Sequence, residues 1–440
     1  MRKSLLLIAA LFLWPLPGLA STLTIEISEG VTGAHPVAVV PFERVDDIEL
    51  DGSGPDEVLA TNLTRSGRFS LLESDDMPEH PHSGSEIDFD RWRDVGMDHV
   101  VVGRLADAGN GVRVRFQVYD PYQEEQVIGY SFRVPRNQLR RLGHRIADLV
   151  YEAILGRPGA FSTSLAYVRT EDEDGDEPRH VLAVADADGH SEQIILDSSE
   201  PLMSPAWDPD GKRLAYVSFE RGRPQIFLQT IATGWRERLS EDRESSSAPA
   251  FSPDGERLAY VSTRDGERDI YIMDLERDGE PIRVTSHYAI DTEPAWLPDG
   301  RGLIFTSDRS GRPQLYRIEL DPRGRPEGSP RRITFEGGYN ASPSVSQDGR
   351  HVAMVQGDRG AFRIAVLDME RGATETIADV RRGESPSYAP NGDMLIYATE
   401  ENGRGVLESV SSEGRARQRL GLDVGNVREP AWSPFDALSQ

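Results

Sequence analysis

A seven-residue phrase recurs along the C-terminal two-thirds of the chain and limits the possible folds more than any other feature. It reads Pro-Ala-aromatic-x-Pro-Asp-Gly in its clearest form. Three clear copies are followed by two degenerate ones and a truncated one, at Pro205–Gly211, Pro249–Gly255, Pro294–Gly300, Pro343–Gly349, Pro386–Gly392 and Pro430–Pro434. The leading prolines lie 44, 45, 49, 43 and 44 residues apart, and this period is typical of four-stranded propeller blades.

Each period contains short runs of β-branched and aromatic residues, separated by Gly, Asp and Pro. In the period that begins at Pro249, the later runs are Arg257–Ser262, Asp269–Leu275 and Ile282–Thr285. With the phrase itself, these runs predict four antiparallel strands. The Pro-Asp-Gly step predicts a tight turn in which Gly takes a positive φ. The nearly continuous apolar run Ile270–Met273 predicts a strand covered on both faces by neighbouring blades.

The two ends of the repeat region complement each other. Ser164–Val168, His180–Val184 and Gln193–Leu196 match the second, third and fourth strands of a blade that lacks its first strand. Glu429–Ser433, near the C-terminus, supplies the missing strand. Five complete blades and this composite blade predict a six-bladed β-propeller over residues 164–440, closed by the C-terminal strand, so that no sheet edge between blades stays open.

Residues 21–155 contain no repeat and mix strands with helices, which predicts a small α/β domain ahead of the propeller and a mainly β protein. Helices are expected at Asp56–Thr64 and at Asn137–Leu155, where apolar residues recur at helical spacing before Gly156. Residues 156–163 are expected to be a linker. Strands are expected at Leu23–Ile27, Val37–Val40, Phe69–Leu72, Val100–Leu105, Val112–Tyr119 and Val127–Val134.

The first 20 residues predict a cleaved secretory signal. Arg2 and Lys3 precede the apolar run Ser4–Trp14, and small residues, Gly18 and Ala20, precede a cut after Ala20. An N-terminal membrane anchor is the alternative, but the run is shorter than the roughly 20 apolar residues of a spanning helix. No cysteine follows the small residues, so a lipoprotein signal is excluded. We expect an exported, periplasmic protein that does not insert into the membrane.

Composition excludes several classes of function. The chain has no cysteine, so it can have no thiol catalysis, disulfide or thiolate metal site. Its formal net charge of −25 over 440 residues argues against nucleic-acid binding, which needs a clustered basic surface. The same charge argues against adhesion to anionic lipid surfaces. The sequence Gly-x-Ser-x-Gly does not occur, which argues against a propeller-capped serine hydrolase.

Several short motifs resemble metal or ligand sites but lack the required spacing. Glu171–Glu177 lacks the two key carboxylates of an EF-hand loop, and Asp186–Gly189 is typical of a turn. His80 and His82 lack the further ligands of a zinc motif. We therefore expect no catalytic residue, no cofactor and no metal. The aromatic residues of the repeated phrase are expected to be core residues of the innermost strands: Trp207, Phe251, Trp296, Tyr388 and Trp432.

The ordered combination of a signal, a small α/β domain and six blades resembles the TolB family of the Tol–Pal cell-envelope system. The resemblance covers the whole mature chain. Besides the blade phrases, its marks are Leu23–Ile27 followed by Pro36–Phe42, the junction Gly156–Phe161 leading to Ala166–Val168, and Ser307–Tyr316. The resemblance implies a monomeric periplasmic adaptor that is not an enzyme. It implies a role in outer-membrane integrity and in envelope constriction during cell division.

The resemblance also implies two partner-binding regions. The mature N-terminus engages the inner-membrane protein TolA, and the propeller engages the peptidoglycan-associated lipoprotein Pal near its channel; some colicins exploit the same propeller surface. A strand-like segment at a free end is suited to strand addition. The candidate TolA-type contacts are Ser21, Thr22, Leu23, Thr24, Ile25, Glu26 and Ile27.

The connections between blades are expected to gather at one channel mouth, which makes a rigidly mounted recognition surface. The candidate Pal-type contacts there are Ser245, Ser246, Ala248, Asp291, Thr292, Glu293, Asn340 and Glu384. Two other classes of function stay open: an exported propeller hydrolase or lyase with an active site at the channel mouth, and a sensor of a small ligand. The repeat supplies no inward-facing set of histidines for the enzyme.

Overall fold

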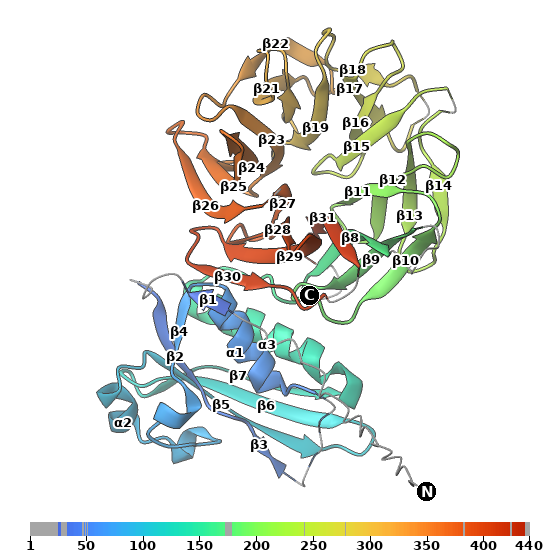
Figure 1. The fold of residues 1–440 in the computed structure, drawn as a ribbon. Coiled ribbons are helices and arrows are strands. Elements are labelled where there is room, and N and C mark those ends of the chain that lie inside the picture. The colour runs from blue at the N-terminus through green and yellow to red at the C-terminus, as the bar shows by residue number, and fades with distance from the viewer. Residues whose placement is uncertain are drawn as a thin grey trace, which may run out of the picture.

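The computed structural model describes residues 25–27, 33–45, 48, 50, 52–171, 178–241, 243–277, 279–381, 383–422 and 425–435. These residues form a small α/β domain and a ring of six blades (Figure 1). The fold is the mainly β, six-bladed architecture that the repeat predicts. The predicted signal and the candidate contacts Ser21, Thr22, Leu23 and Thr24 lie outside the described residues, as do residues 172–177 of the acidic motif.

The α/β domain is built on one mixed sheet with the strand order β4-β2-β5-β6-β7. Strand β2 is parallel to both β4 and β5, while β5, β6 and β7 form an antiparallel meander. The short β3 pairs with the far end of β5. The strands are β2 (His35–Val39), β3 (Glu43–Arg44), β4 (Phe69–Leu71), β5 (His99–Asp107), β6 (Val112–Asp120) and β7 (Glu125–Val134).

Helices α1 (Pro55–Arg65) and α3 (Leu139–Leu155) lie between this sheet and the propeller (Figure 1). The ends of both helices lie within two residues of the predicted ones. Pro55 occupies the first turn of α1, where its missing N–H costs nothing, and α3 ends at Gly156, which has a φ of +69°. The short elements were not predicted: α2 (Phe89–Asp94) and the 3₁₀ turns η2 (Ser74–Asp76), η3 (Gly84–Glu86) and η4 (Arg136–Gln138).

Five blades each contain four consecutive antiparallel strands. The first three are β11 (Leu202–Trp207), β12 (Arg213–Ser218), β13 (Gln225–Thr230), β14 (Arg236–Arg238); β15 (Ser246–Phe251), β16 (Arg257–Ser262), β17 (Asp269–Asp274), β18 (Ile282–Arg283); and β19 (Asp291–Trp296), β20 (Gly302–Ser307), β21 (Gln314–Leu320), β22 (Pro326–Arg332). The other two are β23 (Tyr339–Val345), β24 (His351–Asp358), β25 (Ala361–Asp368), β26 (Thr374–Val380); and β27 (Glu384–Tyr388), β28 (Met394–Glu401), β29 (Arg404–Ser411), β30 (Ala416–Arg419).

The sixth blade joins the two ends of the repeat region. It contains β31 (Asn426–Trp432), β8 (Ser164–Glu171), β9 (Arg179–Asp186) and β10 (Gln193–Ser198). Trp432 pairs with Leu165 and Ala431 with Ala166. The backbone ladder between β31 and β8 therefore closes the ring with the strand that the sequence predicts for this role.

The predicted turn chemistry is present in all five complete copies of the phrase. Their glycines have φ values between +68° and +77°, a region that favours glycine: Gly211, Gly255, Gly300, Gly349 and Gly392. The continuous apolar strands are also covered on both faces, since Ile270, Tyr271 and Ile272 of β17 are all buried. One large apolar core runs across the domain boundary, because Leu63 of α1 and Val150 of α3 belong to the same cluster as Leu165 and Leu407 of the propeller.

Candidate functional site

Each of the six first strands has the same backbone irregularity at the channel. The residue directly before the proline of the phrase has a positive φ, between +47° and +53°, and the strand register shifts there. These pre-proline residues are Ser204, Ala248, Glu293, Ser342, Ser385 and Glu429. Proline disfavours the right-handed helical region for its predecessor, and a bulge in a strand re-aims the side chains beside it. The repeat thus builds a ring of six bulges.

The first strands of all six blades line one central cavity of about 1000 Å³. All six pre-proline residues contribute to its wall, together with the prolines that follow them. Four carboxylates from different blades line it, Asp208, Glu293, Glu384 and Glu429, and Arg428 is also part of the wall. A concave site mounted on a closed ring of strands is rigid, which suits recognition of a protruding partner group.

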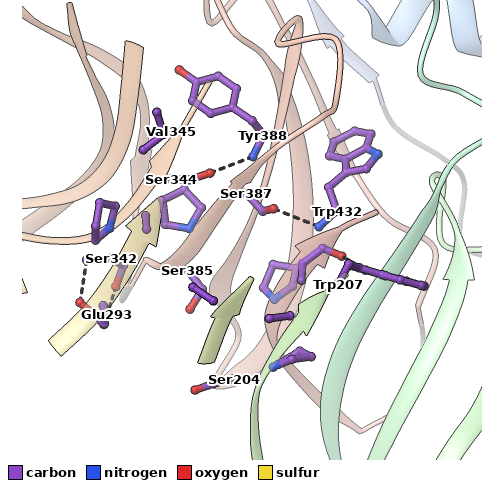
Figure 2. Close-up of a pocket in the computed structure, with 18 of the residues that line it drawn as sticks. Ser204, Trp207, Glu293, Ser342, Ser344, Val345, Ser385, Ser387, Tyr388 and Trp432 are labelled. Carbon is purple, nitrogen blue, oxygen red and sulfur yellow. Dashed lines mark hydrogen bonds between the residues drawn. The ribbon is translucent and has the colours of Figure 1, made fainter. Parts of the chain in front are cut away.

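Hydrogen bonds between neighbouring first strands fix the wall of the cavity (Figure 2). The Tyr388 backbone N–H donates to Ser344 Oγ at 3.2 Å, and the Trp432 N–H donates to Ser387 Oγ at 3.0 Å. The Trp207 ring N–H donates to the Ala431 carbonyl at 3.0 Å. The serine of a copy that begins Pro-Ser therefore accepts a backbone N–H from the neighbouring blade, whereas the tryptophan of a Pro-Ala-Trp copy donates its ring N–H to a backbone carbonyl of the neighbouring blade.

The acidic residues of the ring also link blades. Glu293 Oε2 accepts from the Ser342 backbone N–H at 2.8 Å and from Thr306 Oγ1 at 2.7 Å, while Glu293 Oε1 accepts from Ser342 Oγ at 2.9 Å. In the same way, Glu429 of the sixth blade accepts from the Ser204 backbone N–H of the neighbouring blade. Burial raises the pKa of Glu429, the Ser204 N–H opposes this rise, and the nearby Glu384 adds to it.

The structure separates the predicted Pal-type contacts into three groups. Ala248, Glu293 and Glu384 line the cavity. Ser246, Asp291 and Asn340 are fully buried, with Asp291 paired to Arg309 at 2.7 Å and Asn340 donating to Gln314 Oε1 at 2.9 Å. The half-buried Ser245 and Thr292 are outside the cavity wall. Apart from Ser245, these residues are in the first strands rather than in the connections where the sequence placed them.

The aromatic residues of the phrase have two roles. Trp296, Tyr388 and Trp432 are buried, as predicted, whereas Trp207 and Phe251 are only half-buried. All five also contribute to the cavity wall. The bulges were not predicted, because the proline of the phrase resembles the start of a strand. A proline inside a strand is itself the available signal, since it marks a bulge or an edge.

The described part of the N-terminal segment, β1 (Ile25–Ile27), is paired with the propeller. It adds antiparallel to β30, the outermost strand of the blade β27–β30, with Ile25 opposite Gln418 and Ile27 opposite Ala416. In Figure 1 β1 lies beside β30, close to helix α1. The acceptor edge therefore belongs to this chain's own propeller.

The same blade carries a polar contact with the α/β domain. Asp393 is buried and accepts from the Tyr151 hydroxyl at 2.7 Å. Its carboxylate also pairs with Arg68 at 3.2 Å and Arg157 at 2.8 Å, and Arg68 reaches Glu413 at 2.6 Å. Blade β27–β30 therefore holds both the α/β domain and β1.

Comparison with known proteins adds to this geometry. A family model described as the TolB amino-terminal domain matches residues 23–127, and one described as the TolB beta propeller domain matches residues 151–436. Tol-Pal system protein TolB from Xanthomonas oryzae pv. oryzae (strain PXO99A) is 47% identical over 442 residues, which are 99% of each chain. The chain belongs to the TolB family. The relative from Xanthomonas campestris pv. campestris (strain B100) is 46% identical with the same coverage.

A solved structure supports the TolB assignment across both domains. The crystal structure of TolB from Acinetobacter baumannii matches with a TM-score of 0.83 at 37% identity, covering 94% of this chain and 100% of that one. The prediction that the chain is not an enzyme agrees with TolB relatives that are named as proteins of the Tol-Pal system. Among the described residues, no helix has the length and apolar character needed to cross a membrane.

Sequence analysis also missed a charged cluster between the two domains of this TolB-family chain. His144 of α3 lies with Asp186 and Asp188 of the sixth blade, and their ligand-type atoms are within 4.8 Å of one another. Arg140 is ion-paired with Asp188, and the fully buried Arg65 donates to the Ala187 carbonyl at 2.9 Å. The positive charges of the Arg140 and Arg65 guanidinium groups would repel a metal cation at this position, so the cluster is better described as an ion network between the two domains.

Proposed function

We propose that this chain is a periplasmic adaptor of the Tol–Pal system that is cleaved after Ala20. In this proposal residues 21–27 bind TolA, and the propeller, residues 164–440, binds Pal at its channel mouth. By linking an inner-membrane protein to a peptidoglycan-bound lipoprotein, the adaptor supports outer-membrane integrity and envelope constriction during division. Family membership over the whole chain supports this proposal.

The observation that carries the proposal is the pairing of β1 with β30. Among the described residues the pairing extends over three residues, a short stretch of backbone ladder. Short edge pairings are marginal in water, and a partner that offers a longer strand edge can compete for the segment. The N-terminal segment is thus suited to exchange between the blade edge and TolA.

The second surface is proposed to use the channel mouth. Ala248, Glu293 and Glu384 line the cavity and are the contacts that we propose for Pal. The fully buried Ser246, Asp291 and Asn340 are proposed to support the wall rather than to touch the partner. Glu293 joins two blades, so a partner that contacts it meets a fixed carboxylate.

Deleting residues 21–27 tests the N-terminal part of the proposal. We expect the mature deletion variant to lose TolA binding in titration calorimetry and to keep both Pal binding and its circular dichroism spectrum, because the described part of the deleted segment, β1, is an added fifth strand at the edge of one blade.

The matched control is Glu384→Ala, which we expect to weaken Pal binding and to leave TolA binding intact. Loss of both partners in the deletion variant, together with a changed spectrum, would indicate misfolding and contradict the proposed division of labour. Unchanged TolA binding would contradict it as well.

A further inference from the structure

The α/β domain ends in a long strand with one open edge. Strand β7 has ten residues and, among the described residues, pairs only with β6. Its register is regular from Ile128 to Val134, which pair with Val118 to Val112. An open edge presents unpaired backbone N–H and C=O groups to any extended chain that approaches it. Most of the ten β7 residues are exposed.

Arginines occupy the sheet face that is turned away from α1 and α3. On β6, the valines and phenylalanine between them are buried with the helices, so Arg113 and Arg115 point to the other side. Arg115 lies opposite Arg104 of β5, and Arg113 lies opposite Arg133 of β7. Figure 1 shows the helices on the propeller side of the sheet, so this face looks away from the propeller.

This cationic face is poorly neutralised within the chain. Arg104 pairs with Glu43 at 2.8 Å and Glu86 at 2.6 Å, whereas the structure shows no ion pair between Arg113 or Arg115 and another described residue. Like charges directly opposite on neighbouring strands destabilise a sheet. Arg133 donates to the Ala108 carbonyl and to Asn110 Oδ1, neither of which is charged. Three of the four cross-strand arginines, Arg113, Arg115 and Arg133, therefore have no carboxylate partner among the described residues and are suited to bind an external anion.

The other face of the same edge is aromatic. The rings of Phe116, Tyr130 and Phe132 lie together with centroids between 5.9 and 6.4 Å apart, and the Arg145 guanidinium lies over the Phe132 ring. Phe116 is fully buried, but Tyr130 is 45% exposed at the margin that the helices leave uncovered. The edge of β7 thus separates a cationic face from a partly open apolar face.

We propose that the edge of β7 binds an extended segment of another polypeptide in which acidic and apolar residues alternate. Side chains of an added strand alternate between the two sheet faces. Acidic residues of the added strand that lie opposite Arg133 and Ser131 would place their carboxylates beside the arginines. Apolar residues of the added strand that lie opposite Phe132 and Tyr130 would cover the aromatic face. Guanidinium groups bind carboxylates through paired hydrogen bonds, which favours this chemistry. The surface goes beyond both partner sites proposed above.

An anionic membrane is the competing partner, and the observations favour the polypeptide. Among the described residues, the arginine face carries Ser131, Gly129 and Gln117 beside the arginines, and the exposed Val127 lies beyond them at the register shift of β7, so this face has little apolar surface for insertion into lipid. A lipid surface also offers nothing to the backbone groups of an open strand edge.

The test measures binding of a fluorescein-labelled peptide of alternating Glu and Val to the full mature chain by fluorescence anisotropy. We expect this peptide to bind and to slow amide hydrogen exchange within residues 125–134. A peptide with the same residues in two blocks, and one with Lys in place of Glu, are expected not to bind. In R113E/R115E, which changes two exposed residues, we expect the affinity to fall at least about tenfold.

The matched control is R359E/R371E, which makes the same charge change on turns of the propeller, where the two side chains are 93% and 83% exposed. We expect it to bind the alternating peptide like the unchanged chain. The proposal is overturned if the unchanged chain does not bind this peptide, if the block peptide binds equally well, or if exchange slows elsewhere but not in β7. Binding of phosphatidylglycerol vesicles in place of the peptide, lost in R113E/R115E, would also overturn it.

Discussion

The residues before the repeated prolines hold the propeller's channel in one shape. A non-glycine residue at positive φ costs on the order of 1–3 kcal/mol, and the ring contains six of them. Such positions persist only where the surroundings determine them, and here the following proline and the contacts between blades do so. Glu293 is the clearest case, because its backbone is strained while its carboxylate bridges to Ser342.

Trp432 allows a direct test of the contact between the last strand and its neighbours. It is 6% exposed, and its ring N–H donates to Thr163 Oγ1 at 2.7 Å. We expect Trp432→Ala to destabilise the protein by about 3–5 kcal/mol, because it leaves a large cavity and removes the hydrogen-bond donor to Thr163 Oγ1. The control Trp235→Ala removes a tryptophan that is 58% exposed and should change stability by less than about 0.5 kcal/mol. Equal unfolding midpoints for the two variants in urea would contradict a stabilising role for Trp432 in β31.

At the residue scale, the sequence predicts what local chemistry determines. The turn glycines and the apolar strand Ile270–Met273 follow from such chemistry, and both are confirmed. The exposure of a polar side chain is different, because it depends on residues that are distant in the sequence, in the same blade or in the neighbouring one. Asp291 and Asn340 are typical surface residues in the sequence, yet Arg309 and Gln314 bury them in hydrogen bonds. Arg309 belongs to the same blade as Asp291, whereas Gln314 and Asn340 belong to neighbouring blades, so both the folding of a blade and the assembly of the ring are needed to bring these partners together.

At the scale of elements, length decides what could be predicted. The long α3 and the strands of the meander repeat their pattern often enough to be predicted from sequence, whereas α2 has six residues and β3 has two. Pairing partners are harder to predict than elements. The N-terminal segment was expected to be a strand suited to strand addition, and β1 is a strand. Its residues alone do not indicate that β30 is the strand with which it pairs.

A disulfide between β1 and β30 would test the exchange that the proposed function requires. Ile25 and Gln418 are directly opposite in the antiparallel pair, where Cα atoms are about 4.5–5.5 Å apart and a disulfide can form. The chain has no cysteine of its own. We expect oxidised I25C/Q418C to lose TolA binding and to keep Pal binding, and a reducing agent to restore TolA binding. The single variant Q418C controls for the substitution in β30. TolA binding that is the same in the oxidised and reduced forms would contradict exchange of β1.

At the scale of the whole molecule, the two domains share one apolar core and two polar contacts. Asp393 anchors one contact, and the cluster of His144, Asp188 and Arg65 forms the other. Burial alone would raise the pKa of Asp188, but its hydrogen bond to His190 and the charges around it outweigh burial and lower that pKa. Its stabilising ion pairs are therefore lost only as the pH falls below the ordinary carboxylate range.

His144 should make the stability of the whole molecule depend on mild acid. Burial lowers the pKa of His144 from its ordinary 6.5 to about 4, although Asp188 opposes the change. Between these two pH values the unfolded chain holds a proton on this residue and the folded chain does not, so stability must fall as the pH drops through this window. A pKa that differs by one between the folded and unfolded chain corresponds to about 1.4 kcal/mol of stability.

We therefore expect His144→Gln to flatten the pH dependence of the unfolding free energy. Asn62 Nδ2 lies 2.8 Å from His144 Nδ1, and a glutamine oxygen can accept from the same amide. Between about pH 7 and about pH 4.5, the variant should lose about 2–3 kcal/mol less stability than the unchanged chain in urea titrations. His351→Gln, at a half-exposed position in the propeller, should keep the original slope. If His144→Gln kept that slope too, the buried histidine would not be the group that couples acid to the domain interface.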